Sequence, residues 1–188
     1  MFRRSTLLRR APGLAVLLAL AAMLAPAGAQ ASECANTHLK PTAANVQAVR
    51  DAVLCLHNAE RARHGLPKLR ENWRLRSAAT SHSLRMVLSH FFEHTTPGGL
   101  TMVERIRKLG YMNRAQAWSV GENIAWGSGR LATAAQIQRA WMNSPGHRAN
   151  ILDGSFREIG IGIAPGVPVH LSAAQSGATY TTDFGFRR

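Results

Sequence analysis

The sequence is poor in acidic and aromatic residues, and both shortages limit its function. Ten Asp and Glu oppose 23 Lys and Arg in the 188-residue chain, so the formal net charge is +13. Only 6% of the residues are Phe, Trp or Tyr, and the basic residues form no long run. Nucleic-acid binding usually needs a basic patch interleaved with aromatics, so we do not expect it. We expect a solvated basic surface that is attracted to anionic lipids or polymers.

The N-terminal apolar run, residues 14–24, is shorter than the roughly 20 residues that a membrane-spanning helix needs. Arginines precede it, and the small residues Ala29-Gln30-Ala31 follow it, which is the order of a secretory signal peptide. We therefore expect cleavage after Ala31, a secreted product (extracellular or periplasmic), and no transmembrane anchor afterwards. Loss of residues 1–31 with their four arginines leaves 157 residues, a size that suits one domain, and a charge of +9.

Cysteine is also scarce, with two residues in the whole chain, Cys34 and Cys55. An even pair in an exported chain favours a disulfide, which would tie the mature N-terminus to the first helix. A buried free thiol at Cys55 is the alternative. Two cysteines alone form no convincing metal or redox motif.

The rest of the chain predicts an α+β fold, with helices first and a small, mainly antiparallel sheet last. A polar tether covers residues 32–44, and the domain follows from 45 to 188. Apolar spacing predicts helices over 45–63, 74–89, 101–109 and 132–142, with a glycine-bearing loop around residues 121–129. Alternating or apolar stretches predict strands over 159–163, 167–171 and 179–184.

Three polar clusters lie where predicted elements end. They are centred on His94, on Glu122 and on His147. Two histidines and a glutamate make a plausible set of ligands for a divalent cation, zinc above all. Taken singly, each residue is more often structural, as a helix cap or a loop anchor.

Residues 90–94 also fit H-x-x-E-H, the inverted zinc-peptidase pattern. That chemistry needs both histidines on one continuous helix, whereas Thr95-Thr96-Pro97-Gly98-Gly99 predicts that the helix breaks close by. We do not favour it.

Together the clusters resemble the bacterial branch of the CAP superfamily, the SCP domains of cysteine-rich secretory, antigen 5 and pathogenesis-related proteins. Gly121-Glu122-Asn123-Ile124-Ala125 is similar to its G-E-N-[IL]-A motif, and residues 141–152 to its W-x-x-S-P-G-H-R-x-N-I-L motif. Residues 56–66, 92–99 and 156–162 resemble further family segments, and His82 sits in the family's second helix. The resemblance runs from about residue 53 to 186.

The resemblance implies an α–β–α sandwich whose cleft, in animal and plant members, holds two histidines and two glutamates able to bind a divalent cation. His94 matches the first histidine and Glu122 the first glutamate. The second glutamate falls near Ser144 and the second histidine near Thr179, so neither carries over, although His147 of the bacterial motif could restore a ligand. The complete set of candidate cleft residues is His82, His94, Glu122, Asn123, Ser144, His147 and Asp183, the last being unusual in its strand.

Three functional hypotheses follow. The cleft could bind an extracellular lipid, glycan or cell-wall polymer, which family diversity favours. It could be a metal-dependent hydrolase in which His94 and His147 hold the ion and Glu122 ligates it or acts as general base. It could also be a buried hydrogen-bond network without chemistry. The chain lacks a nucleophile motif such as G-x-S-x-G.

Overall fold

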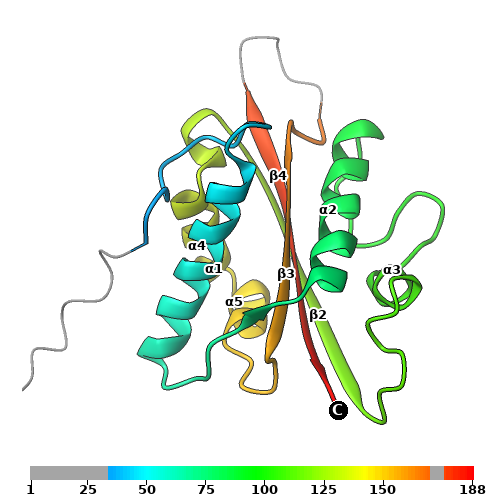
Figure 1. The fold of residues 1–188 in the computed structure, drawn as a ribbon. Helices are drawn as coiled ribbons and strands as arrows, with labels where there is room; N and C mark the ends of the chain where they lie inside the picture. Colours follow the sequence, from blue (N-terminus) through cyan, green and yellow to red (C-terminus); the bar gives the residue numbers. More distant parts are fainter. Residues whose placement is uncertain (1–33, 170–175) are drawn as a thin grey trace, which may run out of the picture.

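The computed structural model describes residues 34–169 and 176–188, which form a sheet with helices on both faces (Figure 1). The helices are α1 (Val46–Arg63), α2 (Trp73–Leu88), α3 (Met102–Lys108), the 3-10 turn η1 (Gly129–Ala132), α4 (Ala134–Asn143) and α5 (Pro145–Ile151). The strands are β1 (Arg70–Glu71), β2 (Trp118–Ser128), β3 (Glu158–Pro165) and β4 (Gly177–Arg187). The expected signal peptide lies outside the described residues.

The sheet has the strand order β1-β3-β4-β2. The two long pairings, β3 with β4 and β2 with β4, are antiparallel, and only the short β1 runs parallel to β3. Helices α2 and α3 cover one face, and α1, α4 and α5 lie on the other (Figure 1). The predicted α+β class and the α–β–α sandwich are therefore confirmed, and β2 is an edge strand.

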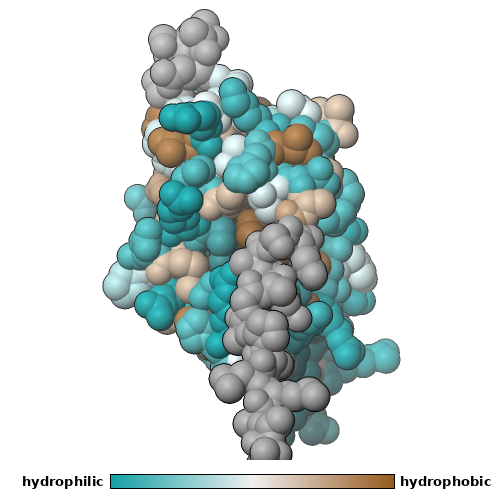
Figure 2. Space-filling model, turned by 90° about the vertical axis from the view of Figure 1, so that its left-hand side faces the viewer, coloured by the Kyte–Doolittle hydropathy of each residue, from teal (hydrophilic) through white to brown (hydrophobic). Residues whose placement is uncertain are grey.

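The two faces of the sheet differ in chemistry. The α1 and α4 face carries the main core, in which Ile159, Ile161, Tyr180 and Phe184 of β3 and β4 pack with Trp141 of α4. The α2 and α3 face has a smaller apolar cluster. The outer surface on the α1 side is mostly hydrophilic, with scattered small hydrophobic groups (Figure 2). The face with the smaller apolar cluster also carries buried polar groups, among them His82, Arg105 and Glu122, and the candidate site lies there.

The predicted helices are confirmed to within two residues at each end, and local capping explains two of their starts. The Asn72 side chain accepts hydrogen bonds from the first backbone N–H groups of α2, and Thr101 and Glu104 form a capping box at α3. Helix α2 ends at Leu88, before His90, so the H-x-x-E-H residues do not share a helix.

The expected loop around residues 121–129 is wrong for most of its length, because residues 118–128 form β2, which pairs with β4 throughout. The glycines that suggested a loop mark close approaches instead. A Cβ at Gly121 would lie 3.0 Å from the Phe156 ring, and one at Gly127 would lie 2.3 Å from the Leu131 carbonyl oxygen.

Two further expectations need correction. Ser144-Pro145-Gly146 ends α4 as predicted, but Pro145 also begins α5, since proline is favoured in the first turn of a helix. The strand expected over 167–171 is not formed by residues 167–169, and its last two positions lie outside the described residues.

The predicted disulfide is confirmed between Cys34 and Cys55, with an S–S distance of 1.98 Å. It fastens the segment before α1 to the middle of that helix. Within the described ranges, no helix combines the length and the apolar character needed to cross a membrane.

Helix α2 rests directly on two glycines of β3, and this contact sets the height of His82 above the sheet. A Cβ at Gly160 would lie 2.0 Å from backbone atoms of Leu75 and Arg76, and one at Gly162 would lie 2.1 Å from the Ala79 carbonyl carbon. Neither backbone can give way cheaply, because helix and strand are both regular here.

We predict that Gly160→Ala lowers the free energy of unfolding by about 3 kcal/mol, because the added methyl group forces α2 off the sheet. Gly98→Ala is the matched control, since a Cβ there meets nothing within 4 Å and should change stability by about 0.5 kcal/mol or less. Urea unfolding of both variants measures the difference, and equal stabilities would show that α2 does not rest on β3.

Candidate functional site

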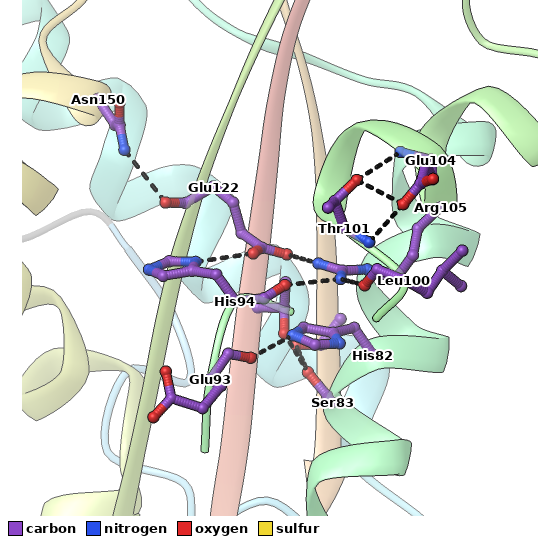
Figure 3. Close-up of polar contacts among 12 residues, drawn as sticks. His82, Ser83, Glu93, His94, Leu100, Thr101, Glu104, Arg105, Glu122 and Asn150 are labelled. Atoms are coloured by element: carbon purple, nitrogen blue, oxygen red, sulfur yellow. Dashed lines mark hydrogen bonds and ion pairs between the residues drawn. The ribbon is translucent and has the colours of Figure 1, made fainter. Parts of the chain in front are cut away.

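Glu122 is the centre of the candidate site. It lies on β2, and its side chain, which is only 1% exposed, faces the α2 and α3 side (Figure 3). Its Oε1 is 2.8 Å from Nδ1 of His94, and its Oε2 accepts a short hydrogen bond from the Arg105 guanidinium. Both carboxylate oxygens therefore have charged or chargeable partners.

Arg105, the partner from α3, also organises the loop that carries His94. Its Nη1 donates to the carbonyl oxygens of His94, at 2.7 Å, and of Leu100, at 3.2 Å. The arginine side chain is 4% exposed, so this is a buried ion pair (Figure 3). One guanidinium thus joins the 94–100 loop to the sheet.

Arg105 was missing from the residues proposed on sequence grounds, although a signal existed. Met102, Ile106 and Leu109 recur at helical spacing, and Arg105 falls on the same apolar stripe. A basic residue on the inward face of a short helix implies a buried partner, because an unpaired buried charge is very costly.

Asp183 on β4 is the direct cross-strand partner of Glu122, so both carboxyl groups project from the same face of the sheet. Its exposure is 0%, and no N–H or O–H donor of the described residues reaches either of its oxygens. Burial, with the nearby Glu122 carboxylate, raises the pKa of Asp183 well above its usual value. Burial and the adjacent carboxylate therefore both favour the neutral form of Asp183.

Opposing effects act on the other two members of the cluster. Burial works to raise the pKa of Glu122, but the His94 hydrogen bond and the Arg105 charge together bring this pKa below its usual value. The hydrogen bond to Glu122 raises the pKa of His94, against a smaller effect of burial. These pKa directions favour an ionised Glu122, a neutral Asp183 and the imidazolium form of His94.

His82 supports the site from α2. It is fully buried, and burial lowers its pKa to about 4, so its ring is neutral. Its Nε2 lies 3.0 Å from the Glu93 carbonyl oxygen and donates to it, which fixes the chain just before His94. The neighbouring Ser83 Oγ lies 2.8 Å from Thr181 Oγ1 and attaches α2 to β4. His82 is therefore a positioning residue.

The remaining candidates lie around α5. Asn123 follows Glu122 on the strand and so faces the opposite side of the sheet. Its Nδ2 donates to the His147 carbonyl oxygen at 2.9 Å, and Asn150 donates to the carbonyl oxygen of Glu122. His147 Nδ1 lies 2.9 Å from Ser144 Oγ. Asn123 thus anchors α5, whose histidine and serine contact each other rather than the Glu122 carboxylate.

His147 nevertheless lies near enough to the central cluster for the charge of His94 to affect its pKa. Burial lowers its pKa, and the positive charge of His94 lowers it further, so the two imidazoles lie within electrostatic range of each other. The structure therefore brings His82, His94, Glu122 and Asp183 together with Arg105. It leaves His147 and Ser144 nearby on the α5 side.

The predicted zinc ligands His94, Glu122 and His147 do not fit a metal site as they lie. Among residues 34–169 and 176–188, no three His, Cys, Asp or Glu side chains are grouped to hold a metal ion. Arg105 already supplies the cation at one Glu122 oxygen, and His94 points Nδ1 at the other. Metal binding here stays a prediction, and the chemistry below is derived from the side chains alone.

Comparison with known proteins places the chain in a family. A family model described as the cysteine-rich secretory protein family (CAP) matches residues 54–167. YkwD of Bacillus subtilis, itself uncharacterised, is 32% identical over 140 residues, which cover 74% of this chain and 48% of that protein. The chain thus spans about half the length of this relative.

Solved structures agree with this fold. An extracellular protein of Bacillus anthracis that contains an SCP domain is 29% identical, with a TM-score of 0.54 over 75% of this chain and 40% of its own. An outer surface protein of Borrelia burgdorferi is 19% identical, with a TM-score of 0.53 over 72% of this chain and 90% of its own. The latter supports the fold alone.

We predict that NMR titration finds the pKa of His94 above 6.5 in the native protein and lower in Glu122→Gln, because the neutral amide no longer favours the imidazolium. The linked stability is fully present below pH 6.5 and is lost as pH rises through the raised pKa. Glu60→Gln, on α1, is the control and should leave the His94 titration unchanged. A native His94 pKa at or below 6.5 would contradict the pairing.

Proposed function

This chain belongs to the CAP family of cysteine-rich secretory proteins, and from that premise we propose that its cleft binds an anionic ligand of the cell envelope. The observation that carries the proposal is the state of His94. Its Nδ1 is bound to a buried carboxylate, while 56% of its side chain remains exposed. In the protonated form, which the Glu122 hydrogen bond favours by raising the pKa of His94, it presents a positively charged N–H group, at Nε2, to a ligand that approaches from solvent.

The engagement of Glu122 favours binding over hydrolysis. A general base needs a free oxygen within reach of water, and both Glu122 oxygens are bonded while the side chain is 1% exposed. The carboxylate acts on the ligand only through His94, by orienting the imidazole and stabilising its charge. The cluster is thus better suited to holding an anion than to activating water.

The overall charge supports an anionic ligand. Without the predicted leader the formal charge is +9, which attracts polymers or head groups bearing phosphate or carboxylate. His147 beside the cluster adds a second imidazole that is neutral near pH 7 because its pKa is lowered. A chargeable donor with a neutral imidazole within electrostatic range of it suits a ligand with both an anionic group and hydroxyls.

Secretion is part of the proposal. It rests on the leader pattern of residues 1–31, and on likeness to a Bacillus anthracis protein whose name describes it as extracellular. A secreted protein is exposed to the cell envelope, so an envelope component is the ligand that we propose.

The competing proposal is a metal-dependent extracellular hydrolase that uses His94, Glu122 and His147 with zinc. It requires Arg105 to withdraw from Glu122, since the guanidinium and a divalent cation cannot share one carboxylate oxygen closely without strong repulsion. Such a rearrangement exposes a buried arginine and costs several kcal/mol.

We predict that the purified protein sediments with vesicles containing phosphatidylglycerol, or with isolated cell walls, and that binding weakens as pH rises through the His94 pKa. His94→Ala should reduce the affinity about three- to tenfold, because one charge-assisted hydrogen bond is lost. His64→Ala, at an exposed histidine directly after α1, is the matched control and should bind like the native protein.

Metal removal separates the two proposals in the same assay. Treatment with EDTA should leave the binding unchanged. Binding abolished by EDTA and restored by zinc, or zinc-dependent turnover of wall or lipid that His94→Ala lacks, would favour the hydrolase. Vesicles of phosphatidylcholine alone should not bind. Equal binding of native protein and His94→Ala at every pH would overturn the role of His94.

A further inference from the structure

A small groove lies between α2 and α3, separate from the exposed His94 surface, and has a volume of about 220 Å³. Six of the residues that line it are Ser77, Ser81, Arg85, Leu100, Arg105 and Lys108. Arg105 is therefore shared by the two sites. Its Nη2 donates to Glu122, and its side chain also lines the groove.

The lining is positively charged, and no acidic residue among the described ones takes part in it. The side chains of Arg85 and Lys108 are exposed at the groove and form no ion pair or hydrogen bond within the part of the chain that the structure describes. The acid close to Lys108 is Glu104, whose carboxylate is bonded to the backbone N–H and the hydroxyl of Thr101. Arg85 and Lys108 therefore form no direct ion pair on this small surface, although the Lys108 charge is felt by Glu104.

Arg105, the third cation of the groove, has a buried N–H donor without an acceptor. Nε of Arg105 is shielded from solvent, and its N–H reaches no acceptor among residues 34–169 and 176–188. A buried donor without a partner costs about 1–3 kcal/mol, and such a group in a native protein calls for an acceptor. Nη1 donates to two carbonyl oxygens and Nη2 donates to Glu122, so Nε is the guanidinium nitrogen that has no acceptor among the described residues.

We propose that this groove binds a phosphate group carried by a compact molecule. Arg85 and Lys108 supply charge, the hydroxyls of Ser77 and Ser81 supply uncharged donors, and Arg105 Nε–H gains the acceptor it lacks. Leu100 offers an apolar wall for the rest of the molecule. The volume is below the 300 Å³ or so of usual organic-ligand pockets, which limits the ligand to a small one.

The site differs from the His94 surface but shares its central cation. A phosphate in the groove and the Glu122 carboxylate contact the same guanidinium from two directions. The inference goes beyond the proposed function, because the groove residues Arg85 and Lys108 touch neither His94 nor Glu122 in any contact of the described residues.

The test is an NMR titration of the full chain with inorganic phosphate and with glycerol 3-phosphate, following the Arg105 Nε–H resonance. We expect that resonance to shift to saturation with both ligands. In the double variant Arg85→Ala/Lys108→Ala the affinity should fall about tenfold, since two charged contacts are removed. Tighter binding of glycerol 3-phosphate identifies an esterified phosphate as the ligand, and equal binding identifies the free ion.

Arg107→Ala/Arg139→Ala is the matched control, because it removes the same charge from exposed positions outside the groove. It should keep native affinity, as should His94→Ala, which distinguishes this site from the envelope-binding surface. Phosphate shifts that never saturate, an unmoved Arg105 Nε–H resonance, or equal losses in both double variants would overturn the proposal. Those results would leave the His94 function untouched.

Discussion

The buried ion pair between Arg105 and Glu122 is the interaction on which the site depends. A carboxylate on the inner side of a sheet is very costly unless charge and hydrogen bonds compensate it. Arg105 provides that compensation from α3, and the same guanidinium holds the carbonyl oxygens of His94 and Leu100. Without it, the loop that carries His94 would lose its attachment and Glu122 would favour a proton.

The packing around this pair follows from the same need. Helix α2 can approach β3 closely because Gly160 and Gly162 carry no side chain, and this brings His82 down to the chain before His94. On the other side of β2, Asn123 and Asn150 bind α5 to the edge strand. Glu122 is thus held directly from α3 and α5, α2 positions the chain next to His94, and His94 is the member of the cluster that reaches solvent.

Much of the fold could be predicted from the sequence, because apolar periodicity records which helix faces are buried. The strand β2 could not, since Gly121 and Gly127 look like loop residues unless one knows that Phe156 and Leu131 pass close by. Likewise Pro145 gives the same signal whether a chain leaves a helix or begins another. Motif resemblance pointed to His94 and Glu122. For Arg105 the sequence offers only its place on the apolar stripe of residues 102–109, which indicates burial but does not show that Glu122 is its partner. The cross-strand pairing of Asp183 with Glu122 depends on register, which a single sequence does not display.

A double-mutant cycle between Arg105 and Glu122 tests the central claim most directly. Urea unfolding of Arg105→Met, Glu122→Gln and the double variant gives the coupling energy of the pair. The account predicts a coupling of about 2–4 kcal/mol, because each single variant leaves a buried group without its partner. A coupling below about 0.5 kcal/mol would mean that the two side chains do not depend on each other, and would contradict the account.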